Sequence, residues 1–193
     1  MKKEDLLIFA EKNNGYLISK DLKKFGIPSI TMTRLEKTGD IKKVARGVYL
    51  LPNQIEDPFL IYSKQYSKLV FSHSTALYLQ GLSNRQFQVF EATFPHSSRI
   101  PTNTELICHT IRNSNYSLGI QQIKTPYGND VPCYDAERCI CDIFVYDDIE
   151  YEDRVFAINQ YLKKADYDKL YSYAKKLKVY DRVHDIFEVV GWK

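Results

Sequence analysis

The sequence predicts an α+β protein in which an N-terminal winged helix-turn-helix is followed by a mixed α/β C-terminal domain. Three observations support this fold class. The chain opens with short amphipathic helical segments that glycines separate, and a pair of strand-like segments with a glycine turn follows them. The remainder contains both strand-like and helix-like segments. We expect domains at residues 1–52 and 59–193, with a polar linker at residues 53–58.

The first two helices are short and amphipathic. One is expected at residues 3–13, and Asn14-Gly15 ends it because glycine suits the position just past a helix end. The second is expected at residues 20–25, with the Ser19 hydroxyl as its N-cap. Their apolar faces are predicted to pack into one core through Leu6, Phe9, Ala10, Leu22 and Phe25.

The third helix is expected at residues 29–38, directly after Pro28. At 100° per residue, Thr31, Met32 and Leu35 fall on one side and are expected to pack on the core. The predicted DNA-binding residues of this helix lie at its start and on its other side: Ser29, Ile30, Thr33, Arg34 and Lys37. Arginine binds guanine in the major groove, lysine meets phosphate or guanine, and an aliphatic group meets the thymine methyl. The alternative is that the two cations form an ordinary solvated helix face.

Two strand-like segments follow at residues 41–44 and 47–51, and Gly47 suits a tight hairpin between them. A hairpin in this position forms a wing, whose cations are expected to contact DNA: Lys42, Lys43 and Arg46. Residues 1–52 hold 11 Lys and Arg against 6 Asp and Glu, whereas the remainder holds 16 against 18. This concentration of positive charge indicates a nucleic acid as the partner of the first domain.

Motifs in both halves of the chain resemble one family. The segment from Leu35 to Pro52 follows the pattern L-x-x-x-G-x-I/L-x-x-V-x-R-G-x-Y-x-L-P and resembles the N-terminal domain of AbiEi-type antitoxins. Residues 71–82 are similar to the family's S-x-x-S-A-L-x-x-x-G-L segment, with Thr75 standing before Ala76. Residues 135–144 resemble its D-x-E-R-T-L-x-D segment, with Cys139 in place of the threonine.

This resemblance implies a function. Such antitoxins belong to abortive-infection systems that act against bacteriophage, and they repress their own operon through the winged helix. Their C-terminal domain counteracts a nucleotidyltransferase-like toxin, and in this type IV arrangement no stable complex with the toxin is required. The resemblance therefore implies an antitoxin and autorepressor that binds double-stranded DNA at inverted repeats in its own promoter. Two alternatives are a winged-helix regulator whose C-terminal domain binds a small ligand, and a DNA nuclease.

The second half is predicted to combine a hairpin-rich sheet with helices. Strands are expected at residues 86–94, 105–112, 120–124 and 131–134, and Tyr127-Gly128-Asn129-Asp130 is a turn signal. Helices are expected at residues 59–69, 72–81, 136–146, 151–164, 167–178 and 181–190. Ser72 and Asp135 are predicted N-caps.

Cations also gather in the last two predicted helices. At helical spacing Lys175, Lys178 and Arg182 share one face, because positions three or four apart are neighbours on a helix. This face is predicted to add a contact to nucleic acid. The alternative is a solvated helix surface.

The sequence contains none of the common catalytic motifs, so we expect no enzyme, no cofactor and no metal site. His73 and Ser74 are neighbours only in sequence, and the other histidines are scattered: His96, His109 and His184. The carboxylates of residues 147–153 are expected to favour a helix N-terminus. Gln122-Ile123-Lys124 resembles half of a nuclease strand motif, for which Glu91 or Glu105 would be the acid.

The cysteines are expected to be free thiols: Cys108, Cys133, Cys139 and Cys141. Cys139 and Cys141 form a C-x-C in a helical segment, where they point in different directions and are expected to be buried small residues rather than metal ligands. The chain has no run of about 20 apolar residues and no signal-peptide pattern at its start. These features predict a cytoplasmic protein without a membrane partner.

Overall fold

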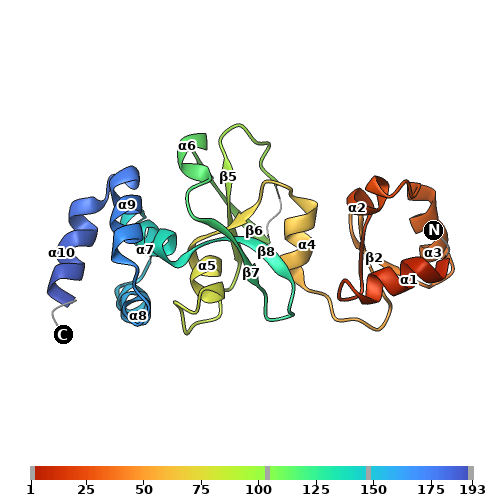
Figure 1. The fold of residues 1–193 in the computed structure, drawn as a ribbon, viewed down its shortest axis with the longest axis horizontal. Helices are drawn as coiled ribbons and strands as arrows, with labels where there is room; N and C mark the ends of the chain where they lie inside the picture. Colours follow the sequence, from red (N-terminus) through yellow and green to blue (C-terminus); the bar gives the residue numbers. More distant parts are fainter. Residues whose placement is uncertain (1–2, 103–104, 147–148, 191–193) are drawn as a thin grey trace. The chain divides into compact units, whose positions relative to one another are not determined.

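The structure, a computed structural model, describes residues 3–102, 105–146 and 149–190 (Figure 1). It confirms the predicted α+β class. The chain divides into two compact units. The first extends to Ser67 and also includes Lys124–Val131, whereas the second comprises Lys68–Ile123 and the chain from Pro132 onward. The predicted linker at residues 53–58 lies within the first unit, and the functional domain boundaries stay a prediction.

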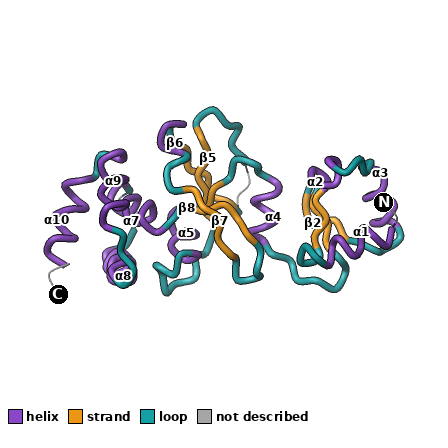
Figure 2. The backbone as a smooth tube through the Cα atoms, viewed as in Figure 1, coloured by secondary structure: helices purple, strands orange, loops and turns teal. Residues whose placement is uncertain are grey.

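The first unit surrounds a small antiparallel sheet with short helices, which Figure 2 distinguishes by colour. Its elements are α1 (Lys3–Glu11), β1 (Tyr16–Ile18), α2 (Ser19–Lys24), α3 (Ser29–Lys37), β2 (Lys42–Ala45), β3 (Val48–Leu50) and α4 (Pro58–Gln65). The strand order is β1-β3-β2. The buried core consists of Leu6, Ala10, Leu17, Leu22, Met32, Leu35, Ile41 and Tyr49. Each large aliphatic side chain buried here contributes roughly 1.5–3 kcal/mol, which stabilises helices too short to persist alone.

Three features of this unit differ from the expectations. Strand β1 was missed, because three residues are too few for a periodic pattern and the strand depends on pairing with β3. Ser19 is not an N-cap: it is the first residue of α2, and Ile18 occupies the cap position without a side-chain bond. Phe25 is 64% exposed and packs edge-on against Phe9, so only Leu22 of the expected apolar pair enters the core.

Asp57 is the buried anchor of α4. Its side chain is 0% exposed and accepts hydrogen bonds from the backbone N–H groups of Phe59, at 2.9 Å, and Leu60, at 3.3 Å. It also accepts hydrogen bonds from the Thr125 hydroxyl, at 2.6 Å, and the Asn129 amide, at 2.8 Å. One carboxylate therefore caps a helix and holds a turn that lies almost seventy residues away in sequence.

The second unit is built on a five-stranded sheet of order β6-β5-β4-β8-β7. Its first elements are β4 (Val70–Phe71), α5 (His73–Leu79), β5 (Phe90–Pro95), β6 (Leu106–Ile111), α6 (Asn113–Tyr116), β7 (Ile120–Lys124) and β8 (Asp130–Tyr134). The expectation of a hairpin-rich sheet was wrong, because β4 pairs with β8 and β5 pairs with β6 in parallel. The predicted turn between β7 and β8 is confirmed.

Four helices complete the second unit and group together in Figure 1: α7 (Ala136–Val145), α8 (Tyr151–Leu162), α9 (Tyr167–Leu177) and α10 (Tyr180–Val190). Helix α7 is the central one and contacts α5, α8, α9 and α10. Asp135 caps it by accepting a hydrogen bond from the Arg138 backbone N–H at 2.9 Å, as predicted. Ser72 occupies the cap position of α5 but makes no side-chain cap bond, so that predicted bond was wrong. Its hydroxyl instead contacts Thr93 and His73.

Candidate functional site

The face of α3 that the sequence predicts to be exposed does face solvent. Met32 and Leu35 are buried, whereas Ile30 is 53% exposed. The remaining predicted DNA-binding residues of the helix are also exposed: Ser29, Thr33, Arg34 and Lys37. The predicted division of α3 into two faces is therefore confirmed, and the 3.6-residue period of a helix accounts for it. The role of the exposed face stays a prediction.

Both ends of α3 are defined by local chemistry. Pro28 stands at the N-cap with an extended backbone. At the other end, the Thr38 hydroxyl donates to the carbonyls of Arg34 and Leu35, each at 3.1 Å, and Gly39 follows in the left-handed conformation. These ends and the two buried side chains hold the helix in one orientation, and the orientation of Arg34 is set with it.

The wing carries one paired and two exposed cations. Lys42 forms an ion pair with Glu56, whose carboxylate oxygen lies 2.8 Å from the lysine nitrogen. Lys43 points to the opposite face of the strand, because successive strand residues alternate, and it is exposed. Arg46 is exposed in the turn, where Gly47 adopts the left-handed conformation that a tight hairpin requires. Lys43 and Arg46 are consequently better placed than Lys42 to contact a phosphate.

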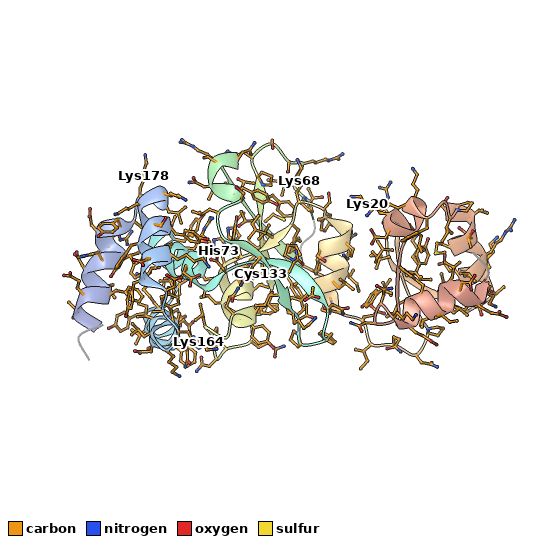
Figure 3. All side chains as sticks on the ribbon, in the orientation of Figure 1. Lys20, Lys68, His73, Cys133, Lys164 and Lys178 are labelled. Atoms are coloured by element: carbon orange, nitrogen blue, oxygen red, sulfur yellow. The ribbon has the colours of Figure 1, made fainter. Side chains whose placement is uncertain are left out.

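The structure adds two lysines that the sequence interpretation missed. Lys20, labelled in Figure 3, and Lys23 are exposed on α2, the helix before α3. They line a hollow of about 350 Å³ together with Pro28 and Ser29 at the start of α3. The first helix of a helix-turn-helix crosses the DNA backbone, so cations here suit phosphate contacts. The position of both lysines in the predicted second helix could have indicated this role from the sequence alone.

The C-terminal cations do not share a helix face. Lys178 adopts a left-handed backbone with φ 62° and ends α9, so Lys175 and Arg182 lie on different helices. The Lys175 nitrogen sits 4.9 Å from the centre of the Tyr180 ring. Arg182 donates a hydrogen bond to the Phe144 carbonyl at 2.6 Å. The prediction of one continuous cationic helix face was wrong, because the left-handed conformation of Lys178 ends α9 and interrupts the helical period.

Two histidines that are distant in sequence meet in the second unit. His73 begins α5 and His109 lies on β6, yet their rings stack with centroids 3.6 Å apart and planes inclined by 13°. Glu91, on β5, lies with one carboxylate oxygen 2.7 Å from His109 Nε2. Its other oxygen accepts a hydrogen bond from the Ser74 hydroxyl at 2.5 Å. The expectation of scattered histidines was wrong for His109, because parallel pairing of β5 with β6 brings Glu91 and His109 together.

This cluster borders a pocket of about 410 Å³, whose lining includes His73, Ser74 and Glu91. Burial favours the neutral form of Glu91, but hydrogen bonds from His109 and Ser74 outweigh it and hold the pKa of this carboxyl below its ordinary value. The carboxylate therefore stays charged beside the two imidazole rings. Arg85, which also lines the pocket, pairs with Glu150 and Asp153.

The nuclease interpretation is not supported by the sheet. Lys124 is on β7 and Glu91 is on β5, and strands β4 and β8 lie between these two strands. Lys124 pairs with Asp130 at 3.0 Å, and Glu105 precedes β6, which is farther still from β7. Within the predicted carboxylate run, residues 147 and 148 lie outside the described residues.

The cysteines are free, as expected. Cys133, labelled in Figure 3, is buried, and so are Cys139 and Cys141. Burial raises the pKa of all three thiols. The thiolate form, which binds metals and reacts with oxidants, is therefore disfavoured. Among the helices in the described part of the chain, none is both long and apolar enough to cross a membrane.

Comparison with known proteins found a family match for the N-terminal part of the chain. Residues 4–52 match the AbiEi antitoxin family. The family is described as "Transcriptional regulator, AbiEi antitoxin", and the match covers α1 to α3 and the wing. Residues 4–52 are called the AbiEi-type domain below, after this similarity. No curated protein sequence matches the chain.

A solved structure extends the comparison beyond the AbiEi-type domain. The RV2827C protein from Mycobacterium tuberculosis has a similar fold, with a TM-score of 0.59 over 86% of this chain and 68% of that chain. The two sequences are 14% identical, so the likeness concerns the fold. It extends beyond residues 4–52 and thus covers both halves of the molecule.

Proposed function

We propose that the chain is an antitoxin and autorepressor that binds inverted repeats in its own promoter through the AbiEi-type domain. Its second half counteracts a nucleotidyltransferase-like toxin of the same operon without requiring a stable complex. The family match supports the regulatory role, and the family resemblance of the second half supports the toxin partner. Winged helices commonly act on symmetric sites as paired copies, which motivates the inverted repeats.

The exposed face of α3 is the observation that supports the proposed DNA binding. Ile30 is exposed beside Arg34 and Lys37, so one face of the helix presents an aliphatic group together with two cations. An aliphatic group, a hydroxyl and two cations match the thymine methyl, base edges and phosphates of a major groove. The exposed wing cations Lys43 and Arg46 supply the backbone contacts that fix a protein on the duplex.

Arg34 and Lys43 should leave different signatures in DNA binding. Arg34→Ala should weaken binding to the operator by about 1–3 kcal/mol and relax base preference, because a guanine contact is lost. Lys43→Ala should weaken all duplexes alike and reduce the slope of log affinity against log salt by about one. Fluorescence anisotropy with promoter and scrambled duplexes, at several salt concentrations, measures both effects.

Two control variants accompany that titration. Lys42→Ala should change affinity less than Lys43→Ala, because Glu56 already compensates the Lys42 charge. Lys12→Ala removes an exposed cation just after α1, outside the proposed surface, and should leave specificity unchanged. If Arg34→Ala weakened promoter and scrambled duplexes equally, Arg34 would be a phosphate contact and the proposed base contact would be wrong.

Repression and antitoxicity should be separable by point variants. The double variant Arg34→Ala/Arg46→Ala should lose promoter repression and still rescue growth beside the toxin, since both residues lie in the AbiEi-type domain. The full chain is the right material, because the first unit extends past Pro52 and includes Lys124–Val131. A promoter–reporter fusion measures repression, and colony counts under toxin induction measure rescue.

Protein level decides how the separability test is interpreted, so both strains are compared by immunoblot. Lys12→Ala is again the matched control and should retain both activities. Loss of rescue by the double variant at a wild-type protein level would mean that the two functions share a surface. The modular arrangement would then be abandoned.

A further inference from the structure

We propose that His73, Glu91 and His109 form a binding site for one divalent transition-metal ion of the Zn²⁺ or Co²⁺ type. Each residue contributes one ligand atom, and these three atoms all lie within 4.8 Å of one another. Among the residues that the structure describes, this is the single group of three metal-binding side chains so arranged. The proposal does not depend on the proposed regulatory function.

The ligand set determines the class of metal. Two imidazole nitrogens and a carboxylate oxygen suit zinc and its first-row neighbours, whereas calcium and magnesium prefer oxygen ligands alone. Glu91 Oε2 lies 2.7 Å from His109 Nε2, so the carboxylate and imidazole ligand atoms are already close together. The His73 side chain is buried, and those of Glu91 and His109 are 15% and 22% exposed, so a bound ion would be shielded from bulk water on every side except the one that faces the pocket.

A second layer of hydrogen bonds already orients the ligands. Ser72 Oγ lies 3.0 Å from His73 Nδ1, and the Thr93 hydroxyl donates to the same Ser72 oxygen at 2.9 Å. The contact at Nδ1 makes Nε2 the ring nitrogen of His73 that would bind the metal. Ser74 holds one oxygen of Glu91, which leaves the other oxygen facing His109. Such outer partners fix ring orientation and raise the affinity of metal sites.

His73 has a left-handed backbone conformation, which positions its ring beside the other two proposed ligands. Its φ is +50°, a conformation that few residues other than glycine adopt. This turn directs the ring against His109 and Tyr146, with ring centroids 3.6 Å and 4.6 Å away respectively. Strained positions of this kind concentrate at functional sites.

Binding requires one adjustment. Metal–nitrogen bonds lie in the plane of an imidazole ring, and the two ring planes are nearly parallel. One ring must therefore rotate about its Cβ–Cγ bond so that both nitrogens point at the same ion. The metal would take the place of the hydrogen between His109 Nε2 and the Glu91 carboxylate, and the released proton would pass to solvent. Three protein ligands leave a coordination position open, and the pocket of about 410 Å³ beside His73 and Glu91 gives water or a further ligand access to it.

The test uses the tag-free full chain and two metals. Calorimetric titration with Zn²⁺ should give one ion per chain, and Co²⁺ should produce visible d–d absorption bands of a low-coordinate site. His109→Gln and Glu91→Gln should each lower affinity by more than about 100-fold, and Ser72→Ala by roughly 10–100-fold. Added Zn²⁺ should raise the melting temperature of the wild-type chain and of none of the ligand variants.

The other two histidines provide controls. His96→Gln removes an exposed histidine and should leave binding unchanged, and His184→Gln removes a ring that lies 3.3 Å from Glu188 and can hold an ion only weakly. Paramagnetic shifts of histidine ring protons in the wild-type chain give a readout that needs no variant: Co²⁺ should move the His73 and His109 signals and spare His96. Absence of stoichiometric binding by the wild type, or unchanged affinity of folded His109→Gln and Glu91→Gln, would overturn the proposal.

Discussion

Replacing Arg138 with alanine is expected to lower the free energy of unfolding by about 3–5 kcal/mol, because the change leaves a buried carboxylate without its partner. Arg138 is 1% exposed in the first turn of α7, and its Nε lies 2.8 Å from the carboxylate of Asp142, which is also buried. The guanidinium also donates to the carbonyls of Asn115 and Leu118 and lies over the Tyr134 ring. Chemical denaturation monitored by circular dichroism measures the loss.

The same variant should show a characteristic pH dependence. Burial raises the pKa of Asp142 above its ordinary value, although Arg138 acts in the opposite direction, and removing the arginine raises this pKa further. A carboxyl whose pKa is raised in the folded state contributes stability below its unfolded pKa and loses it as pH rises through the folded pKa. The difference between wild type and Arg138→Ala should therefore shrink as the pH is lowered from 7.

Two further variants test the explanation. Arg138→Ala/Asp142→Asn should be more stable at pH 7 than Arg138→Ala alone, because the second change removes the unpaired charge. Arg85→Ala, which breaks ion pairs on an exposed surface, should leave the free energy of unfolding unchanged within error. Equal losses in Arg138→Ala and the double variant would show that lost packing, not the buried charge, dominates.

Replacing Asp57 with alanine is expected to cost about 3 kcal/mol or more, since hydrogen bonds to a buried charge contribute roughly 1.5–3 kcal/mol and this carboxylate accepts several. The loss should appear in the first unit. Backbone amides of Phe59, Leu60 and Asn129 should exchange with solvent faster, because the helix cap and the β7–β8 turn lose their common acceptor. Hydrogen exchange at residue resolution, beside chemical denaturation, detects both effects.

Asp57→Asn provides the conservative comparison and should cost less, because an amide oxygen can still cap α4. Asp21→Ala removes an exposed carboxylate of α2 and is the matched control, with no expected change in exchange at these amides. If Asp57→Ala accelerated exchange at the start of α4 but not in the β7–β8 turn, the contacts of Thr125 and Asn129 would be incidental. The proposed anchoring of the turn would then be wrong.

The resemblance of residues 135–144 to a family motif acquires a physical explanation in the structure. Asp135 caps α7, and both Asp135 and Glu137 pair with Lys169 of α9, at 3.1 Å and 2.8 Å. Arg138 and Asp142 pair with each other. The charged residues of this motif thus bind one another and other parts of the same unit, which gives them a structural role around α7.

The exposed face of α3 was predictable because it depends on neighbours within one helix turn. The period of 3.6 residues places Met32 and Leu35 opposite Arg34 and Lys37 whatever the rest of the chain does. The same holds for the glycine turn of the wing and for the Asp135 cap. In contrast, Lys42 was predicted as a DNA contact from its strand position alone. Its ion-pair partner Glu56 lies fourteen residues away, so no local pattern could indicate that the Lys42 charge is already paired.

What the sequence by itself determined is therefore local: the α+β class, the order of most helices and strands, the two faces of α3 and the similarity of residues 4–52 to the AbiEi antitoxin family. Tertiary structure alone decided which strands are neighbours, and this strand order places His73, Glu91 and His109 close together. It also decided the burial of Asp57 and the end of α9 at Lys178. The physical reason is that periodicity and capping act over a few residues, whereas strand order and buried polar networks depend on segments separated by tens of residues, whose pairing no local pattern encodes.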